Sequence, residues 1–374
     1  MTATTPTAGR TGSGSGATGS AAPGPAARAT GGTRSVRTAG GISLRYSPRA
    51  VVAVTACLLV ALVLAVVTLG RGDYPLGPVE VVRALTGGGD PAADFVVNEL
   101  RLPRVATALL TGAALALSGA VLQALVRNPL GSPDILGLTQ GAATGALLVV
   151  AAGGGSLALA GGAVAGGVGA GLLIWALAWR QGVTGHRLVL VGIGAAAVLT
   201  GVNGYLLTRV KLMEAARALL WLTGSLDGRG WADALPLLAV LAVLLPVVLL
   251  GCGPGLRMLE MGEDAAVALG VPVARIRVVL LASAVLLASV AAAAAGPVSF
   301  VALTAPQLAR RLTRAPGPHL LASAAMGSAL LVAADLAAQH AFGDRQLPVG
   351  VVTGVLGGGY LVWLLAAQHR AGRL

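Results

Sequence analysis

The sequence predicts an all-α polytopic membrane protein with about ten transmembrane helices. Of its 374 residues, 56% are hydrophobic and only 11% are charged, whereas a soluble domain carries about 25% charged residues. Several apolar runs reach the length of about 20 residues at which a helix crosses a hydrocarbon core. Glycine is abundant, with 55 residues, and aromatic residues make up only 3%. Such small residues let helices approach closely in lipid.

Residues 1–46 precede the first apolar run and differ from it in composition. They are mainly Gly, Ala, Thr, Ser and Pro with arginines and no acidic residue. Such a segment buries too little apolar surface to offset its ordering entropy. We therefore expect a disordered tail over 1–46 and a transmembrane domain over 47–374. A cleaved signal peptide fits poorly, because the apolar run begins near residue 50 and no clear cleavage site follows it.

Apolar runs divide the domain into spans. The seventh and eighth come from 278–309, an uncharged stretch cut by Gly296, Pro297 and Pro306, which predicts one full span, a break and a shorter tilted span. In the fourth, Gly162, Gly166 and Ala170 recur every four residues and predict a packing face for a neighbouring helix. The expected spans are 50–69, 105–126, 135–152, 157–179, 188–208, 234–251, the two within 278–309, 320–338 and 349–367.

Basic residues indicate the orientation. With the N-terminus inside and ten alternating spans, 17 of the 26 lysines and arginines fall on the inner side, as the positive-inside rule expects. The net charge of +12 is therefore interpreted as this bias rather than as a nucleic-acid surface. Both termini are expected in the cytoplasm.

No pattern for bond chemistry is present. A phosphate-binding loop needs Gly-x-x-x-x-Gly-Lys-Ser/Thr, and the sole lysine, Lys211, is not in one. His-Glu-x-x-His and Gly-x-Ser-x-Gly are absent, and Cys57 and Cys252 lack metal-ligand spacing. The sequence thus predicts neither an enzyme nor a metal site.

The stretch 101–141 carries the most specific signal. It contains Arg101-Leu-Pro-Arg104, Asn128-Pro129-Leu130 and a glycine-rich continuation. Together with patterns that continue to about residue 365, it resembles the iron-siderophore/cobalamin (FecCD-type) family of ABC importer permeases. The resemblance implies a type II permease arrangement and a role as the transport subunit for ferric siderophores or a similar iron chelate. Haem and cobalamin are the alternative substrates.

The resemblance also implies partners. These are a second permease copy or paralogue, two cytoplasmic ATPase subunits that hold ATP and Mg, and an extracytoplasmic substrate-binding protein. This chain itself would carry no cofactor and bind no nucleic acid. It would lie among the lipids of a bacterial plasma membrane as a multi-pass protein.

A short helix is expected near 260–270, with glycines at 262 and 270 and acids in its first turn, where the helix dipole favours them. The residues alone leave open a solvated connector or a docking surface. Family members carry Gly-Glu-x-x-Ala-x-x-Leu-Gly here, a pattern that docks in a cleft of the ATPase. The resemblance therefore assigns ATPase coupling to Glu260, Gly262, Glu263, Asp264, Ala266, Leu269 and Gly270.

Arg101 and Arg104 lie at the mouth of the second span. Arginines in this place can snorkel to lipid headgroups, or they can hold carboxylates bidentately. The resemblance implies docking of the binding protein. Relatives place a further arginine in an Asp-x-x-x-Arg pattern, where this chain has Asp335 and Gln339. Arg345 is the candidate to replace it.

Thr200, Gly204 and Thr208 lie on one stripe of the fifth span, with Asn203 beside it. The stripe predicts helix packing first and a lining of the translocation pathway second. Asp335 is interpreted as an acid that packs helices, with an ion site as the alternative. An ion-coupled secondary transporter needs such a site and is the rival hypothesis to an ATP-driven permease. A membrane enzyme or a purely structural protein is a weaker third.

Overall fold

A computed structural model describes residues 34–37, 43–72, 74–178, 185–315, 317–341 and 346–370. Most of the tail predicted over 1–46 lies outside these residues. Within it, β1 (Arg34–Arg37) and β2 (Ser43–Tyr46) pair as an antiparallel hairpin, with Arg34 opposite Tyr46. The remaining described elements are helices.

The described residues form fifteen α-helices, and two π-helical turns, Val96–Arg101 and Val247–Cys252, join α3 to α4 and α9 to α10. The α-helices are α1 (Pro48–Gly70), α2 (Pro78–Leu85), α3 (Pro91–Phe95), α4 (Leu102–Val126), α5 (Leu138–Ala151), α6 (Ser156–Ala178), α7 (Gly185–Arg209), α8 (Leu212–Leu222), α9 (Trp231–Pro246), α10 (Gly253–Glu260), α11 (Glu263–Ala268), α12 (Val273–Ala295), α13 (Val301–Thr313), α14 (Leu320–His340) and α15 (Val349–Arg370).

Seven helical segments of the described chain are long and apolar enough to cross a membrane. Five of them are α1, α6, α7, α12 and α14. The other two are continuous helices, Pro91–Val126 with 36 residues, which includes α4, and Trp231–Glu260 with 30 residues, which includes α9 and α10. α5 and α13 have only 14 and 13 residues, too few for a hydrocarbon core of about 30 Å. The number of about ten complete crossings therefore stays a prediction.

The break predicted within 278–309 is confirmed. α12 ends at Ala295 and α13 begins at Val301. Gly296 and Phe300 both have positive φ, 73° and 67°, and Pro297 cannot continue a helix. A left-handed backbone is unusual for a residue as bulky as phenylalanine. The break is thus a sharply bent segment.

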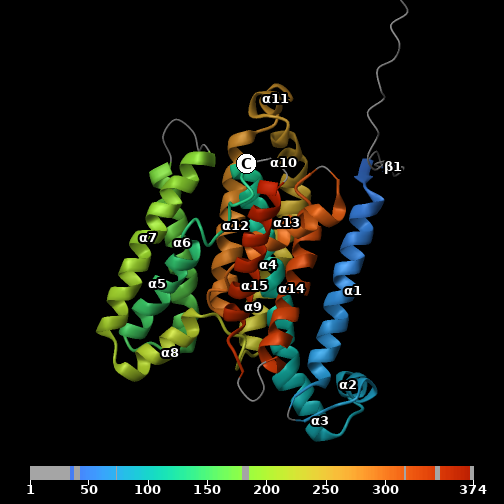
Figure 1. Ribbon diagram of the computed structural model, residues 1–374, viewed down its shortest axis with the longest axis vertical. Helices are drawn as coiled ribbons and strands as arrows, with labels where there is room; N and C mark the ends of the chain where they lie inside the picture. The colour runs from blue at the N-terminus through green and yellow to red at the C-terminus, as the bar shows by residue number, and fades with distance from the viewer. Residues whose placement is uncertain are drawn as a thin grey trace, which may run out of the picture.

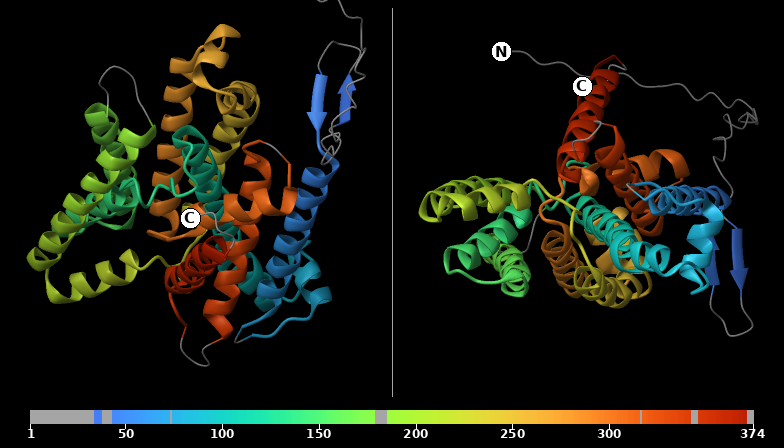
Figure 2. Two further views of the ribbon diagram at one scale, coloured as in Figure 1. Left: turned by 45° about the horizontal axis from the view of Figure 1, so that its top comes forward. Right: turned by 90° about the horizontal axis from the view of Figure 1, so that it is seen from below.

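α4 is the central helix (Figure 1), and it packs against α12, α13 and α14. α5, α6 and α7 form a group on one side of these helices, and α1 covers the other side, as the right-hand view of Figure 2 shows. α11 marks one end of the molecule, here called the hairpin end. α2, α3 and α8 mark the opposite end (Figure 1), here called the mouth end.

Small residues permit the closest contacts. A Cβ added at Gly119 of α4 would lie 1.8 Å from the carbonyl oxygen of Ala302 in α13, and one at Gly112 would lie 2.3 Å from that of Gly327 in α14. The packing face predicted on α6 is also confirmed, because a Cβ at Gly145 of α5 would lie 2.0 Å from the oxygen of Gly162. In lipid the hydrophobic effect does not drive helices together, so close backbone packing stabilises their association instead.

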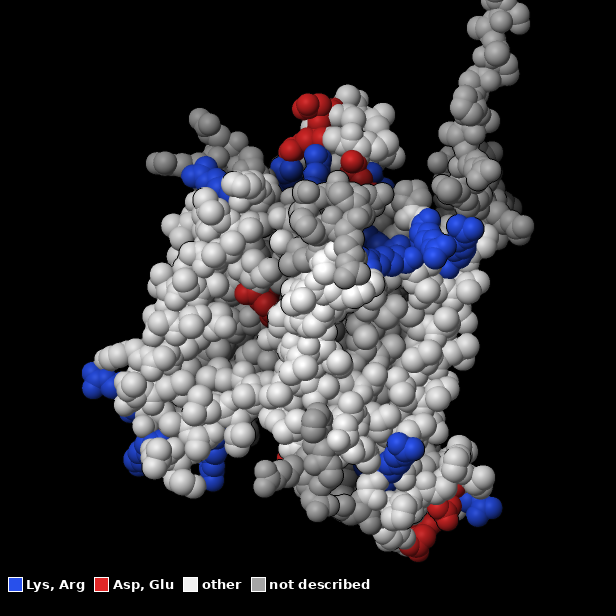
Figure 3. All heavy atoms as spheres, viewed as in Figure 1, with Lys and Arg blue, Asp and Glu red and all other residues white. Residues whose placement is uncertain are grey.

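Charged side chains gather at the two ends of the molecule, and the surface between them is almost entirely uncharged in the view of Figure 3. Such a band matches a hydrocarbon layer, in which exposed charges are costly. The charge pattern therefore agrees with helices that run across a membrane from the hairpin end to the mouth end.

Replacing Gly119 with alanine tests the close contact of α4 with α13. We expect Gly119→Ala to destabilise the protein by about 1–3 kcal/mol through overpacking. Gly161→Ala is the matched control, because nothing lies within 4 Å of a Cβ at this helical glycine. The measurement is the apparent melting temperature in detergent. Equal melting temperatures for the two variants would contradict the packing described here.

Candidate functional site

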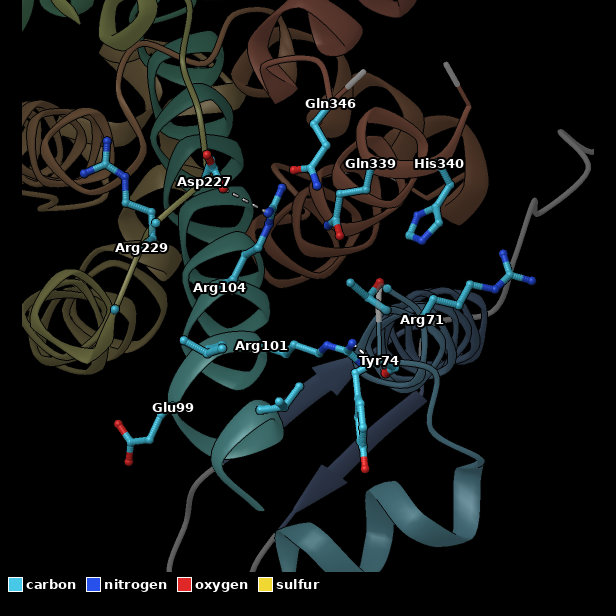
Figure 4. A pocket seen from close by; sticks show the side chains of 16 residues that line it. Arg71, Tyr74, Glu99, Arg101, Arg104, Asp227, Arg229, Gln339, His340 and Gln346 are labelled. Carbon is cyan, nitrogen blue, oxygen red and sulfur yellow. Dashed lines mark hydrogen bonds and ion pairs between the residues drawn. The ribbon is translucent and has the colours of Figure 1, made fainter. Parts of the chain in front are cut away.

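A cavity of about 750 Å³ opens at the mouth end. Elements far apart in the sequence form it, including the end of α1, the beginning of α4, the α8–α9 loop and the end of α14. Figure 4 shows the charged side chains around it. Its charged lining residues are Arg71, Arg101, Arg104, Arg229, Glu99 and Asp227. Four arginines against two carboxylates give this lining an excess of positive charge.

Arg104 holds a buried carboxylate. Its Nε and Nη2 donate to the two oxygens of Asp335 at 3.2 and 3.0 Å. Asp335 is only 1% exposed and also accepts a hydrogen bond of 2.7 Å from Gln339 Nε2. The interpretation of Asp335 as an acid that packs helices is thereby confirmed. Its charge is paired, so it is not a free ion site.

A second carboxylate approaches Arg104 from the α8–α9 loop. Asp227 Oδ1 lies 3.6 Å from Arg104 Nη1, and the Asp227 side chain is 79% exposed (Figure 4). An exposed pair of this kind contributes about 0–1 kcal/mol. Arg104 is therefore committed mainly to Asp335 and presents its remaining edge to the cavity. Its docking role stays a prediction.

Arg101 ties the beginning of α4 to the end of α1. Its Nη1 and Nη2 donate to the carbonyl oxygens of Leu69 and Tyr74, each at 2.8 Å. The guanidinium lines the cavity while it makes these contacts. Arg345, the third residue predicted for docking, lies outside the described residues. The structure thus brings Arg101 and Arg104 to one cavity.

At the hairpin end, α10 and α11 form a compact hairpin. α11 has six residues and lies between Gly262 and Gly270, as the sequence predicted. These two glycines have φ values of 126° and 78°, a backbone region that glycine enters without strain. Glu263 and Asp264 occupy the first turn of α11, and Glu260 ends α10.

The hairpin has a buried face and an exposed face. Ala266 is buried against Leu259 and Val273. Leu269 and Met261 are 64% and 63% exposed. They lie beside the exposed acids of the first turn. An exposed apolar patch with a polar rim is typical of a protein-interaction surface. The residues predicted for coupling therefore lie together on one projecting element.

One of the acids on this hairpin is paired within the chain. Arg277 of α12 contacts Glu263, with N–O distances of 2.5 and 2.9 Å. The two side chains are 23% and 47% exposed. The pair holds α11 against the beginning of α12 and leaves Asp264 exposed to solvent.

The stripe predicted on α7 and the neighbouring Asn203 lie on different faces of the helix. Asn203 is buried, accepts a hydrogen bond of 2.6 Å from Thr144, and donates one of 3.1 Å to the side chain of Gln140. It therefore packs α7 against α5. Thr200, Gly204 and Thr208 are exposed, in contrast. Their place in a translocation pathway stays a prediction.

Asp134 is a polar residue that sequence reasoning missed. It lies in the α4–α5 connection and accepts a hydrogen bond of 3.4 Å from the backbone N–H of Phe300, at the break before α13. Burial raises the pKa of Asp134 from 3.8 to about 6, and hydrogen bonds from Phe300 and Thr139 oppose the shift only partly. The signal was its place directly before an apolar run.

No group of three or more His, Cys, Asp or Glu residues that could hold a metal ion occurs within the described part of the chain. The clusters described above contain arginines, amides and one or two carboxylates. Such groups bind anions and position helices.

A double-mutant cycle tests the pairing of Arg104. Asp335→Asn and Arg104→Gln each break a buried pair, so we expect each to lower the stability by about 3–5 kcal/mol. Asp227→Asn is the control and should cost no more than about 1 kcal/mol. Apparent melting temperatures in detergent measure both. Additive effects of Arg104→Gln and Asp335→Asn would contradict the pairing.

The raised pKa of Asp134 predicts a pH dependence. Stability from a raised carboxyl pKa is fully present below about pH 4 and is lost as the pH rises through about 6. Between pH 4 and 7 the wild type should therefore lose about 1–3 kcal/mol relative to Asp134→Asn, which cannot ionise. Melting temperatures across this range measure the difference. A constant difference would contradict the shift.

Comparisons with known proteins agree with this arrangement. Residues 57–367 match the FecCD transport family. The ferric enterobactin transport system permease protein FepG of Escherichia coli (strain K12) is 46% identical over 303 residues, which cover 81% of this chain and 92% of FepG. The vitamin B12 import system permease protein BtuC of Yersinia enterocolitica is 35% identical over 275 residues, which cover 72% of this chain and 81% of BtuC.

A solved structure shares the fold. An inward-facing conformation of a metal-chelate type ABC transporter superposes with a TM-score of 0.73 and 28% sequence identity, and the match covers 84% of this chain and 98% of that chain. The family match spans most of the sequence and includes both ends of the site. This chain therefore belongs to the FecCD transport family.

Proposed function

We propose that this chain is the membrane-spanning permease subunit of an ATP-driven importer of ferric siderophores. It would translocate substrate that a binding protein delivers. The main support is the 46% identity to a ferric enterobactin permease over 92% of that protein. The relatives also include permeases for achromobactin, iron citrate and vitamin B12. The substrate would be a ferric siderophore or a similar iron chelate, and haem or cobalamin is the alternative.

The hairpin end is proposed to face the cytoplasm. The distribution of basic residues supports this orientation through the positive-inside rule. α1 begins and α15 ends toward the hairpin end (Figure 1), which supports cytoplasmic positions for both termini. The mouth end, with its arginine-lined cavity, would then receive the binding protein. Carboxylates of that protein would contact Arg101, Arg104 and Arg345.

A second permease copy or a paralogue would complete the membrane domain, with about ten spans in each copy. Helix α15 supports this proposal, because its glycines Gly354 and Gly358 have open space on the Cβ side. Small-residue faces of this kind are suited to close helix packing in lipid. The exposed stripe of Thr200, Gly204 and Thr208 would then line the pathway between the copies.

The proposed mechanism is alternating access without bond chemistry in this chain. Two cytoplasmic ATPase subunits would bind ATP and Mg. They would contact the hairpin at Glu260, Gly262, Glu263, Asp264, Ala266, Leu269 and Gly270. The exposed apolar and acidic face of the hairpin supports this role. A wrapped chelate needs no metal ligands from the pathway, so the paired state of Asp335 fits the mechanism.

Reconstitution with the ATPase and the binding protein tests the proposal. We expect Glu263→Ala and Gly270→Val to reduce chelate uptake at least tenfold, because the first removes a docking acid and the second strains a backbone with a φ of 78°. Gly87→Val is the matched control. Gly87 has a φ of 75° and open space around its Cβ position, but it lies at the mouth end. Unchanged uptake by the hairpin variants would contradict the coupling role.

The same vesicles distinguish the substrates and the rival mechanism. Ferric enterobactin, ferric citrate and cobalamin are compared as substrates that stimulate ATP hydrolysis. We expect ferric enterobactin to stimulate ATP hydrolysis most. Uptake that collapses with an uncoupler while ATP is held constant would contradict an ATP-driven importer and favour an ion-coupled secondary transporter.

A further inference from the structure

The end of α4 at the hairpin end is bonded directly to α10. Arg127 follows the last residue of α4 and has a left-handed backbone, with a φ of 53°. Its Nη2 donates to the carbonyl oxygen of Leu259 at 2.6 Å. Leu259 lies in the last turn of α10, where helix carbonyls carry the negative end of the dipole. A guanidinium is the natural partner for such a carbonyl, because charge-assisted hydrogen bonds are the stronger ones.

A second link joins the same end of α4 to α13. Gln123 is 1% exposed, and its Oε1 accepts a hydrogen bond from Arg310 Nη2. Its Nε2 donates to the carbonyl oxygen of Leu303 at 3.1 Å. Gln307 adds a bond of 3.0 Å from its Nε2 to the carbonyl oxygen of Pro129. The buried amide of Gln123 is therefore satisfied entirely by α13.

Arg310 closes the arrangement. Its charge interacts with that of Glu260, the last residue of α10. Hydrogen bonds thus join the end of α4 to α10 through Arg127 and Leu259 and to α13 through Gln123 and Arg310. We call these four residues, with Glu260 next to Leu259, the α4 junction. The hairpin is also attached to α12, through the ion pair of Glu263 with Arg277 and the packing of Leu259 and Ala266 against Val273. The bond to α4 is thus one of two attachments of the hairpin.

α4 is suited to pass a displacement onward. The most apolar part of the segment Pro91–Val126, which includes α4, is 78% buried, the highest share among the candidate spans of the described chain. Its glycines hold it against the backbones of α13 and α14, and its far end carries Arg101 and Arg104 at the mouth cavity. A closely packed helix moves as a unit rather than deforming.

We propose that Arg127 is a positioning residue that transmits movement of the α10–α11 hairpin to α4, with the Arg310–Gln123 bond as the second part of the link. The inference rests on the proposed function, because the movement comes from the ATPase. Arg127 is not one of the residues assigned to ATPase docking, and it bonds to Leu259, the neighbour of Glu260.

Transport by the reconstituted complex provides the first test. We expect Arg127→Gln to bind the ATPase and hydrolyse ATP within twofold of wild type, while chelate uptake per ATP hydrolysed falls at least fivefold. Arg127→Lys keeps a cationic donor and should restore at least half of the loss. Arg275→Gln is the control, since Arg275 is an exposed arginine on the same end of the molecule and should behave as wild type.

Two transport outcomes would overturn the inference. One is wild-type uptake per ATP by Arg127→Gln. The other is a parallel loss of ATPase binding and hydrolysis, which would make Arg127 a docking residue instead. Failure of the wild-type chain to bind the ATPase would contradict the proposed function itself, so the two failures are distinguishable.

Distances between spin labels provide a second test. Labels are placed at Met258 in α10, at Leu130 after α4 and at Val51 in α1, each exposed, in a chain whose Cys57 and Cys252 are replaced by alanine. ATP binding should change the distance from Met258 to Val51 and leave that from Met258 to Leu130 constant. In Arg127→Gln the second distance should change as well. A hairpin that moves apart from Leu130 in the wild type, or that does not move, would overturn the inference.

Discussion

The contact of the α4 backbone with its neighbours is the constraint on which the rest of the structure depends. Gly112 and Gly119 leave no room for a side chain between α4 and the backbones of α14 and α13. In lipid the hydrophobic effect does not drive helices together, so such contacts and a few polar bonds must fix their arrangement. Both functional ends of the molecule are attached to this helix, since Arg104 bonds to Asp335 at one end and Arg127 bonds to Leu259 at the other.

This arrangement is suited to transport by movement of packed helices. Charges lie mainly at the ends of the molecule, and the buried acid Asp335 is neutralised by Arg104. A rigid central helix with polar bonds at both ends is a mechanical element rather than a chemical one. The energy for its movement would come from outside the chain, through the projecting hairpin.

Much of this structure could be predicted from the sequence because local patterns specify it. Apolar length predicted α1, α6 and α7, and Gly296 with Pro297 predicted the break before α13, since neither continues a helix readily. The glycines around α11 marked the hairpin. The small-residue period on α6 predicted its packing face. Each of these signals lies within one stretch of chain.

The remaining features depend on contacts between distant residues. Arg104 and Asp335 are 231 positions apart, so no spacing rule could pair them. Asn203 lies beside the stripe of Thr200, and only the packing of α5 shows that Asn203 is the buried residue. The role of Asp134 could not be predicted, because its partner is the backbone N–H of Phe300, which no side-chain pattern reveals. The shortness of α5 and α13 left the number of complete crossings open.

We propose that a separate ATPase binds the α10–α11 hairpin from the cytoplasmic side. Labelling of Asp264→Cys with a membrane-impermeant thiol reagent tests it most directly, in a chain without Cys57 and Cys252. The account predicts labelling in inside-out vesicles, no labelling in intact cells, and protection when the ATPase is bound. Labelling from the outside of intact cells, or equal labelling with and without the bound ATPase, would contradict it.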